Sequence, residues 1–219
     1  MTGHDLFKSI ADLPSTIPLF PLAGALLLPR TNLPLNIFEP RYLKMVDDAL
    51  AAERLIGMIM PRVEEDEDRL FPTGCAGRIT AFSETDDGRY LITLTGVSRF
   101  RLRRELETDT PYRRAEADWT PFAGDLSPDA HARDVDRSRL LSALRLYLDR
   151  NDLEADWNSI DAAPTEGLVN ALASIAPVET AEKQALLEAP SIADRAEVLV
   201  TLIELSLAGS DEMQDQTVQ

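Results

Sequence analysis

Few residues of this chain have the types and the spacing that metal binding requires. Its only cysteine, Cys75, and its two histidines, His4 and His131, lie far apart along the 219 residues. A structural zinc site takes four such side chains, so these three cannot fill one without carboxylates. A calcium loop alternates oxygen ligands around a glycine, and the acidic runs at residues 47–48 and 64–68 lack that spacing. We therefore expect no metal ion and no cofactor.

The motifs of common catalytic sites are also missing from the sequence. It contains no Gly-x-x-x-x-Gly-Lys-Ser/Thr phosphate loop and no Gly-x-Ser-x-Gly nucleophile elbow. Cys75 lies between Gly74 and Ala76 at the start of a predicted strand, where a reactive thiol is one interpretation. Free cysteine is, however, among the most buried residue types, so we interpret Cys75 as a packing residue. We predict no catalytic residue, and a catalytic site assembled only in three dimensions stays open as an alternative.

The charge of the chain limits its partners. The 22 basic and 38 acidic residues give a formal net charge of −16, which has the wrong sign for attraction to a phosphate backbone. Residues 1–10 lack a basic stretch followed by an apolar one, and the uncharged stretch at residues 17–29, which Pro18 and Pro21 interrupt, is too short to span a bilayer. With a single cysteine, these features predict a cytoplasmic protein without membrane contact or nucleic acid as its main partner. They indicate no particular oligomeric state.

The first 124 residues have the pattern of short β-strands separated by turns. Asp86-Asp87-Gly88 lies between two β-rich runs, and Asp and Gly tolerate the positive φ of tight hairpin turns. We therefore predict that residues 77–85 pair with residues 89–97. Apolar runs predict strands at 17–20, 25–28, 55–60, 75–82, 89–95, 100–106 and 112–119. So many short strands favour a small, mainly antiparallel barrel.

One helix interrupts these strands. From Tyr42 to Leu50, apolar residues fall at i, i+3, i+4, i+7 and i+8, which places them in one stripe of a helix. Pro40 suits the first turn of this helix, where a missing N–H is tolerated. By contrast, residues 64–69 are acidic or basic without apolar spacing, and we predict a solvated loop there.

A run of arginines follows the predicted hairpin. Arg99, Arg101, Arg103 and Arg104 are interleaved with Phe100 and Leu102. This alternation is typical of a strand with one wet face. A basic recognition stripe is the alternative interpretation.

Beyond residue 124 the spacing of the apolar residues becomes helical, and the net charge becomes more negative. Residues 1–124 carry 15 basic and 19 acidic groups, whereas residues 125–219 carry 7 and 19. Helices are predicted from a stripe between Leu140 and Leu148, at residues 165–175 and 180–188, and from Ile192 to near Gly209. Ser191 and Asp194 resemble a capping box. We predict a barrel at 1–124, a bundle of four or five helices at 125–209 and a polar tail at 210–219.

Three stretches of the sequence resemble one known family. The first runs through Ile17-Pro-Leu-Phe-Pro-Leu, Leu28-Pro-Arg and Leu33-Pro-Leu-Asn-Ile-Phe-Glu-Pro-Arg-Tyr42. The second is Phe71-Pro-Thr-Gly-Cys-Ala-Gly-Arg-Ile79, and the third is a hairpin, Asp87 to Leu102, that contains Gly-x-x-Arg-Phe. Together they resemble the N-terminal, substrate-binding domain of Lon protease over residues 17–122.

The resemblance implies an α+β fold in which a PUA-like, mainly antiparallel β-barrel with one inserted helix precedes a C-terminal helical bundle. It also implies a module that engages protein substrates. Because the 219 residues carry no phosphate loop, the resemblance suggests a stand-alone substrate-binding domain without ATPase and protease domains. The expected function is non-catalytic binding of unfolded polypeptide or of a protein partner.

The resemblance places substrate contacts at the start of the inserted helix, which gives Phe38, Glu39, Arg41 and Lys44 as candidate binding residues. Arg41 and Lys44, at i and i+3, share a face away from the core. A local ion pair between Glu39 and Arg41 that only fixes the helix entry is the alternative for those two residues. Phe38 is a contact residue or a core residue, and Tyr42 is predicted to lie in the core.

RNA binding is the alternative function, because PUA-like barrels elsewhere recognise RNA. The residues that would form its basic patch are Arg99 to Arg104 together with Arg113 and Arg114. The net charge of −16 opposes this function.

Overall fold

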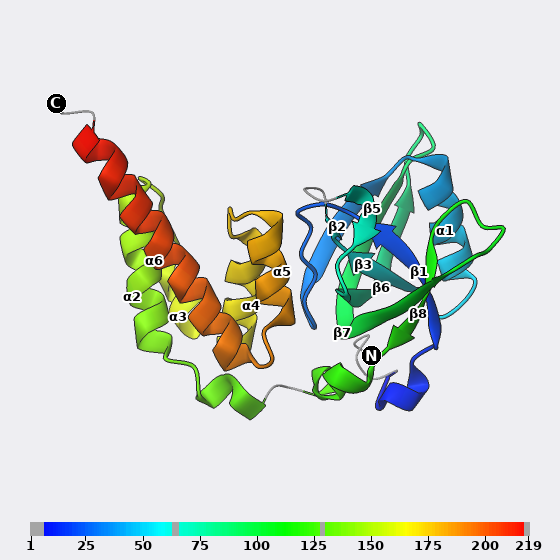
Figure 1. The fold of residues 1–219 in the computed structure, drawn as a ribbon, viewed down its shortest axis with the longest axis horizontal. Helices are drawn as coiled ribbons and strands as arrows, with labels where there is room; N and C mark the ends of the chain where they lie inside the picture. Colours follow the sequence, from blue (N-terminus) through cyan, green and yellow to red (C-terminus); the bar gives the residue numbers. More distant parts are fainter. Residues whose placement is uncertain (1–6, 63–65, 128–129, 217–219) are drawn as a thin grey trace. The chain divides into compact units, whose positions relative to one another are not determined.

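The chain forms two compact units, residues 1–128 and residues 129–219. The computed structural model describes residues 7–62, 66–127 and 130–216, with the backbone alone described at 66–68, 130–131 and 209–216. The first unit is built mainly of strands and the second of helices (Figure 1). The predicted α+β class is therefore confirmed. No helix in the described part of the chain is long and apolar enough to cross a membrane.

The first unit contains eight described strands, one α-helix and two short 3-10 helices. In chain order these are η2 (Ile10–Asp12), β1 (Thr16–Pro21), β2 (Asn32–Ile37), α1 (Pro40–Leu50), β3 (Leu55–Ile59), β4 (Pro61–Arg62), β5 (Asp66–Leu70), β6 (Thr73–Glu84), β7 (Tyr90–Leu106), β8 (Arg114–Asp118) and η3 (Thr120–Leu126).

The six-stranded sheet closes on itself. Its order is β2-β7-β6-β3-β1-β8, and β8 also pairs with β7, so five strands form a ring and β2 extends it along β7. Only the β1–β3 pair is parallel among the described pairings, which confirms the mainly antiparallel barrel. The long strand β7 makes this closure possible because its first half pairs with β2 and its last residues pair with β8.

The apolar faces of these strands form the core of the barrel. Ile17 and Leu19 of β1 and Phe100 of β7 are fully buried. The ring of Phe100 packs edge-on against Trp119, with 5.8 Å between ring centroids, and the Trp119 indole N–H donates to the Pro14 carbonyl. Burial of such large apolar side chains is the main source of stability for this unit.

The predicted hairpin is confirmed, including its turn. Residues from Gly77 to Glu84 pair with residues from Gly96 to Tyr90, and Gly88 has a φ of +77°. The runs 89–95 and 100–106, however, belong to the single strand β7 rather than to two strands.

The prediction of a strand at residues 25–28 is wrong. Leu26, Leu27 and Leu28 are buried, but they lie in an irregular segment that crosses β7. There the Arg30 N–H donates to the Gly96 carbonyl, and the Gly96 N–H donates to the Thr31 carbonyl. An apolar run indicates that a segment is buried, but it does not by itself indicate that the segment pairs with a strand of the sheet.

The predicted acidic loop is also wrong over its second half, because residues 66–69 belong to β5, which pairs with β4. A short two-stranded ribbon needs backbone pairing and does not require the apolar alternation used for the prediction. Residues 64 and 65 lie outside the described residues.

Helices η4 (Ala130–Arg133), α2 (Arg137–Arg150), α3 (Trp157–Ala162), α4 (Thr165–Ile175), α5 (Thr180–Glu188) and α6 (Ile192–Gln216) make up the second unit. Helix α6 packs against α2, α4 and α5, and the predicted bounds of α4 and α5 are confirmed. The short α3 was not predicted. Helix α6 continues beyond Gly209 to Gln216, so the predicted end there is wrong: residues 210–216 contain no proline and can continue a helix. Residues 217–219 lie outside the described residues.

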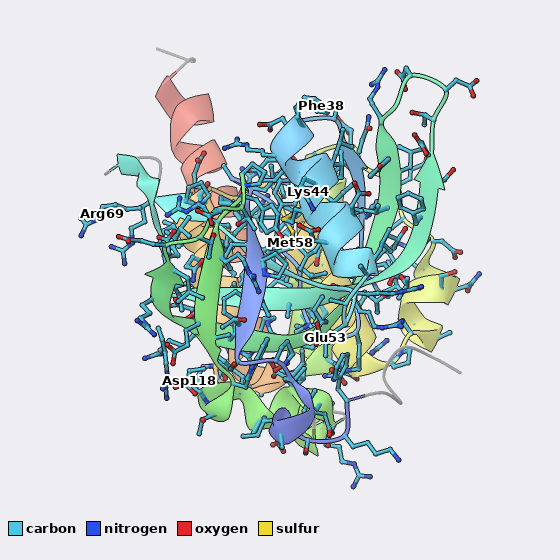
Figure 2. The ribbon with its side chains drawn as sticks, turned by 90° about the vertical axis from the view of Figure 1, so that its right-hand side faces the viewer. Phe38, Lys44, Glu53, Met58, Arg69 and Asp118 are labelled. Carbon is cyan, nitrogen blue, oxygen red and sulfur yellow. The ribbon has the colours of Figure 1, made fainter. Side chains whose placement is uncertain are left out.

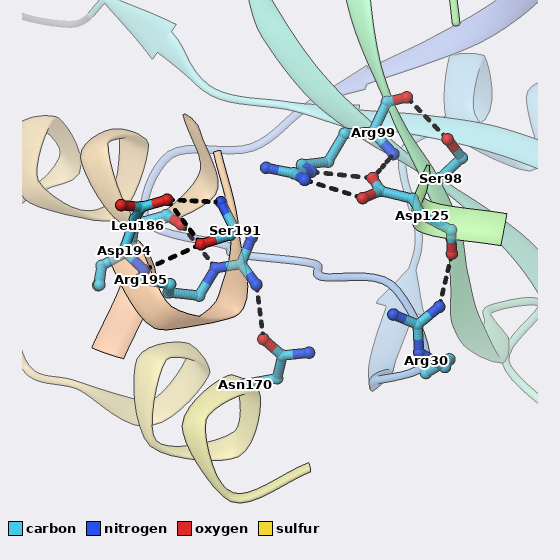
Figure 3. A network of polar contacts seen from close by, with 9 residues as sticks. All are labelled: Arg30, Ser98, Arg99, Asp125, Asn170, Leu186, Ser191, Asp194 and Arg195. Carbon is cyan, nitrogen blue, oxygen red and sulfur yellow. Dashed lines mark hydrogen bonds and ion pairs between the residues drawn. The ribbon is translucent and has the colours of Figure 1, made fainter. Parts of the chain in front are cut away.

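A buried arginine holds the start of α6 in place. Arg195 donates from Nε to the Leu186 carbonyl and from Nη1 to Oδ1 of Asn170, each at 2.8 Å (Figure 3). One turn earlier, the Ser191 N–H and hydroxyl donate to Asp194, and the Asp194 N–H donates to the Ser191 hydroxyl oxygen. The predicted capping box is therefore confirmed.

Candidate functional site

Helix α1 positions all four predicted binding residues. Phe38 follows β2 and is 63% exposed, and Pro40 occupies the first turn, as the sequence predicts. Figure 2 shows Phe38 at one end of α1 and Lys44 farther along the helix. The buried stripe of α1, from Tyr42 to Ala49, faces the barrel, so Arg41 and Lys44 lie on its exposed side.

Glu39 and Arg41 pair with each other at the helix entry. The Glu39 carboxylate accepts from Nε of Arg41 at 2.9 Å and lies 2.8 Å from Nη2. The Arg41 guanidinium also lies over the Tyr42 ring, 4.5 Å from its centroid. Tyr42 is buried against Phe20, which confirms the prediction that it is a core residue. The local ion pair between Glu39 and Arg41 is thus present, and Phe38 is exposed rather than in the core.

Lys44 belongs to a short chain of polar contacts that connects α1 to the segment before β8. Its ammonium lies 2.5 Å from the Asp48 carboxylate, which also accepts from the Tyr112 hydroxyl at 2.8 Å. The hydrogen bonds from Lys44 and Tyr112 lower the pKa of Asp48. Burial and the hydrogen bond to Asp48 raise the pKa of Tyr112 from 10.0 to about 12.

The raised pKa of Tyr112 predicts a loss of stability at high pH. Because the unfolded phenol ionises near pH 10 and the folded one near 12, the contribution of Tyr112 is complete below pH 10 and is lost between these values. The phenolate absorbance of the folded protein should show a component with a pKa near 12 that Tyr112→Phe removes. A Tyr112→Phe titration that retains this component would show that another tyrosine is responsible.

A groove of about 830 Å³ lies beside the start of α1. Four segments that are far apart in the sequence line it: the end of β1 and the residues after it, the start of α1, the first residue of β4, and the end of β7 with its connection to β8. The lining residues are Pro21, Ala23, Arg41, Tyr42, Pro61, Leu106, Glu107, Thr108, Thr110, Pro111, Tyr112 and Arg113. Of the four predicted residues, only Arg41 is among them.

The groove combines apolar and charged side chains. Its prolines, Leu106 and the two tyrosines supply apolar area, and Arg41 and Arg113 supply charge. Arg113 makes a bidentate pair with Glu105, with two contacts of 2.5 Å. None of the lining residues is a cysteine, histidine or serine, so no Ser–His or Cys–His pair lines the groove.

Sequence reasoning missed the side of the groove formed by residues 106–113. These residues reach Arg41 only because β7 and β8 are paired in the closed barrel. The one available signal was Pro111-Tyr112, an aromatic residue in a segment otherwise rich in polar residues.

The arginine run of β7 divides into a buried and an exposed part. Arg99, predicted on the wet face, is instead buried and forms an ion pair with Asp125 of η3 at 2.8 Å (Figure 3). Arg104 pairs with Glu116 at 2.8 Å, and Arg103 lies 3.5 Å from Asp118. Interleaved carboxylates therefore compensate much of the charge that a basic stripe would present to RNA.

Of the single cysteine and the two histidines, only the side chain of Cys75 lies in the described part of the chain. Cys75 is 1% exposed in β6, as expected of a packing residue. Within the described residues, no three His, Cys, Asp or Glu side chains gather as a metal site would need. His4 and the side chain of His131 lie outside the described part of the chain.

A closed, mainly antiparallel barrel with an inserted helix, followed by a helical unit, defines a fold of the α+β class. The sequence comparisons identify the family. Residues 16–204 match the family described as the ATP-dependent protease La (LON) substrate-binding domain. The chain belongs to this family.

The curated relatives are Lon proteases. The Lon protease of Parabacteroides distasonis is 28% identical over 217 residues, which cover 91% of this chain and 25% of the relative. The Lon protease of Desulfosudis oleivorans is 31% identical over 108 residues, or 47% of this chain and 13% of the relative. This chain thus aligns with a quarter or less of the length of these two relatives.

Solved structures agree on the fold. The crystal structure of a Lon N-terminal domain protein from Xanthomonas campestris has a TM-score of 0.63 at 24% identity. The N-terminal domain of Lon protease from the Mycobacterium avium complex has a TM-score of 0.65 at 18% identity. In each case the match covers 86% of this chain and 98% of the other chain.

Proposed function

We propose that this protein is a non-catalytic module that binds unfolded polypeptide or a protein partner. The observation that carries the proposal is the match of residues 16–204 to a family named for substrate binding. The absence of common catalytic motifs from the sequence fits binding without turnover. The buried single cysteine suits a reducing compartment, so we place this function in the cytoplasm.

The binding surface in this proposal is the start of α1 with the groove beside it. Phe38 is a large, mostly exposed apolar side chain, and its burial against a partner would favour binding. Arg41 and Lys44 present charge on the same helix, and both are already partly oriented, by Glu39 and Asp48 respectively. An extended segment lying along the groove would contact apolar area and charged groups together.

The test is fluorescence anisotropy of a labelled, permanently unfolded model protein titrated with the purified chain. We expect saturable binding that Phe38→Ser weakens and that the double variant Arg41→Gln, Lys44→Gln weakens further. Removal of one central aromatic anchor typically reduces affinity by roughly tenfold or more. Circular dichroism of each variant checks that the fold is kept.

Two matched variants control for general effects. Leu146→Ser removes another large exposed apolar side chain, from α2, and Arg103→Gln with Arg104→Gln removes two exposed charges from β7. Both should leave the affinity unchanged. Absence of binding by the wild-type chain, or equal losses in the control variants, would refute the proposed function or its location. Hydrolysis of the model protein by a preparation free of other proteases would refute its non-catalytic character.

A further inference from the structure

The hairpin of β6 and β7 carries an exposed aromatic pair that neither the proposed groove nor the core uses. Phe82 is 44% exposed, and its ring packs edge-on against Tyr90 with 5.0 Å between ring centroids. The two rings belong to neighbouring strands, because Phe82 pairs with Ile92, two residues beyond Tyr90. Both Figure 1 and Figure 2 place this hairpin beside α1.

Two carboxylates border the aromatic pair. Glu84 is the cross-strand partner of Tyr90, and Asp47 of α1 accepts a hydrogen bond from the Tyr90 hydroxyl. That hydrogen bond, followed by burial and by the negative charges of Asp47 and Glu84, raises the pKa of Tyr90. We call Asp47, Phe82, Glu84 and Tyr90 the hairpin aromatic surface.

The negative charge of this surface is not compensated by the neighbouring basic side chains. Lys44 pairs with Asp48, and Arg89 pairs with Asp87 at 2.5 Å. In the described residues, neither Asp47 nor Glu84 forms an ion pair. An aromatic face beside carboxylates that form no ion pair with a described residue attracts a cation, because the ring quadrupole and the carboxylate charge act in the same direction.

An apolar hollow of about 480 Å³ lies on the other face of the same hairpin. Most of its lining side chains, including Leu91 and Ser83, alternate along the strands with Tyr90, Phe82 and Glu84 and therefore point away from the two rings. The hollow is thus separate from the hairpin aromatic surface.

We propose that the hairpin aromatic surface binds lysine or arginine side chains of extended polypeptide segments. The basic side chain lies over Phe82 and Tyr90 with its charge near Asp47 and Glu84. This inference rests on the proposed polypeptide-binding function and names the class of segment that the module prefers.

The test compares labelled peptides of equal length that repeat Lys-Leu, Gln-Leu or Glu-Leu pairs, titrated with the full chain in an anisotropy assay. The wild-type chain should bind the Lys-Leu peptide about tenfold more tightly than the Gln-Leu peptide, and the Glu-Leu peptide least. The double variant Asp47→Asn, Glu84→Gln should reduce this preference to about threefold or less. Phe82→Leu keeps apolar area but removes the aromatic face, and should also weaken binding of the Lys-Leu peptide.

A matched variant separates this site from general attraction to an acidic protein. Glu53→Gln with Asp86→Asn removes the same charge from exposed positions outside the surface and should keep the full preference. Equal reduction by both double variants would overturn the proposal, and so would equal wild-type affinity for the Lys-Leu and Gln-Leu peptides. Equal affinity for these two peptides would leave the proposed polypeptide binding intact. If the chain bound neither the peptides nor the unfolded model protein, both proposals would be overturned.

Discussion

Replacing Asp125 with alanine is expected to lower the free energy of unfolding of the barrel unit by about 3–5 kcal/mol. Asp125 accepts hydrogen bonds from Nε, Nη2 and the backbone N–H of Arg99, at 2.8–2.9 Å. Both side chains are less than 10% exposed. The variant would therefore remove the acceptor of three hydrogen bonds that Arg99 donates from buried atoms, and each such loss is costly in a water-poor environment.

The measurement is urea unfolding, monitored by tryptophan fluorescence in a Trp157→Phe background. In this background the signal comes from Trp119 of the barrel core alone. Arg104→Ala is the matched control, because it breaks an ion pair of the same length whose side chains are 71% and 30% exposed. An exposed pair of this kind contributes roughly 1 kcal/mol or less. If Asp125→Ala were no more destabilising than Arg104→Ala, the Arg99–Asp125 pair would have no special role in stability.

The burial of Arg99 illustrates what the sequence alone could not provide. The alternation of arginines with Phe100 and Leu102 correctly predicts a strand, and Arg101, Arg103 and Arg104 are exposed. Arg99 is buried because it pairs with Asp125 of η3, which lies 26 residues farther along the chain. A periodic pattern carries local information, whereas the partner of a buried charge is set by the tertiary fold.

The candidate site also has a part that the sequence predicts and a part that only the tertiary fold determines. The helical spacing from Tyr42 to Leu50 was enough to predict α1, the buried position of Tyr42 and the exposed positions of Arg41 and Lys44. The groove beside Arg41 and the pairing of Phe82 with Tyr90 depend on strand register and barrel closure. A single sequence does not specify either of these long-range arrangements, although the Asp-Asp-Gly turn did predict the hairpin that brings the two rings together.

The motif Gly-x-x-Arg-Phe, which carried part of the family resemblance, has structural roles at all three positions. Phe100 is fully buried in the barrel core, and Arg99 forms the ion pair described above. Gly96 is the point where the irregular segment around Leu28 crosses β7. These roles explain why the motif identifies the fold and does not locate a binding surface.

Gly96→Ala is expected to destabilise the barrel unit by about 3 kcal/mol or more. A Cβ atom at residue 96 would lie 2.0 Å from the Leu28 carbonyl oxygen and 2.8 Å from its carbonyl carbon. These neighbours are backbone atoms that two hydrogen bonds, Arg30 N–H to Gly96 and Gly96 N–H to Thr31, hold against β7. Relief of the clash therefore requires the crossing segment to move away, which breaks both hydrogen bonds and uncovers buried leucines.

Gly124→Ala provides the control, because a Cβ atom there would have no neighbour within 4 Å. In the same Trp157→Phe background, urea unfolding should show a large loss for Gly96→Ala and a change within about 0.5 kcal/mol for Gly124→Ala. Hydrogen exchange gives a second readout: the amides of Arg30 and Gly96 should lose protection in Gly96→Ala before the rest of β7 does. Unchanged stability and unchanged protection at these two amides would contradict the close backbone crossing. In that case the crossing could no longer explain why Leu26, Leu27 and Leu28 are buried without belonging to a strand.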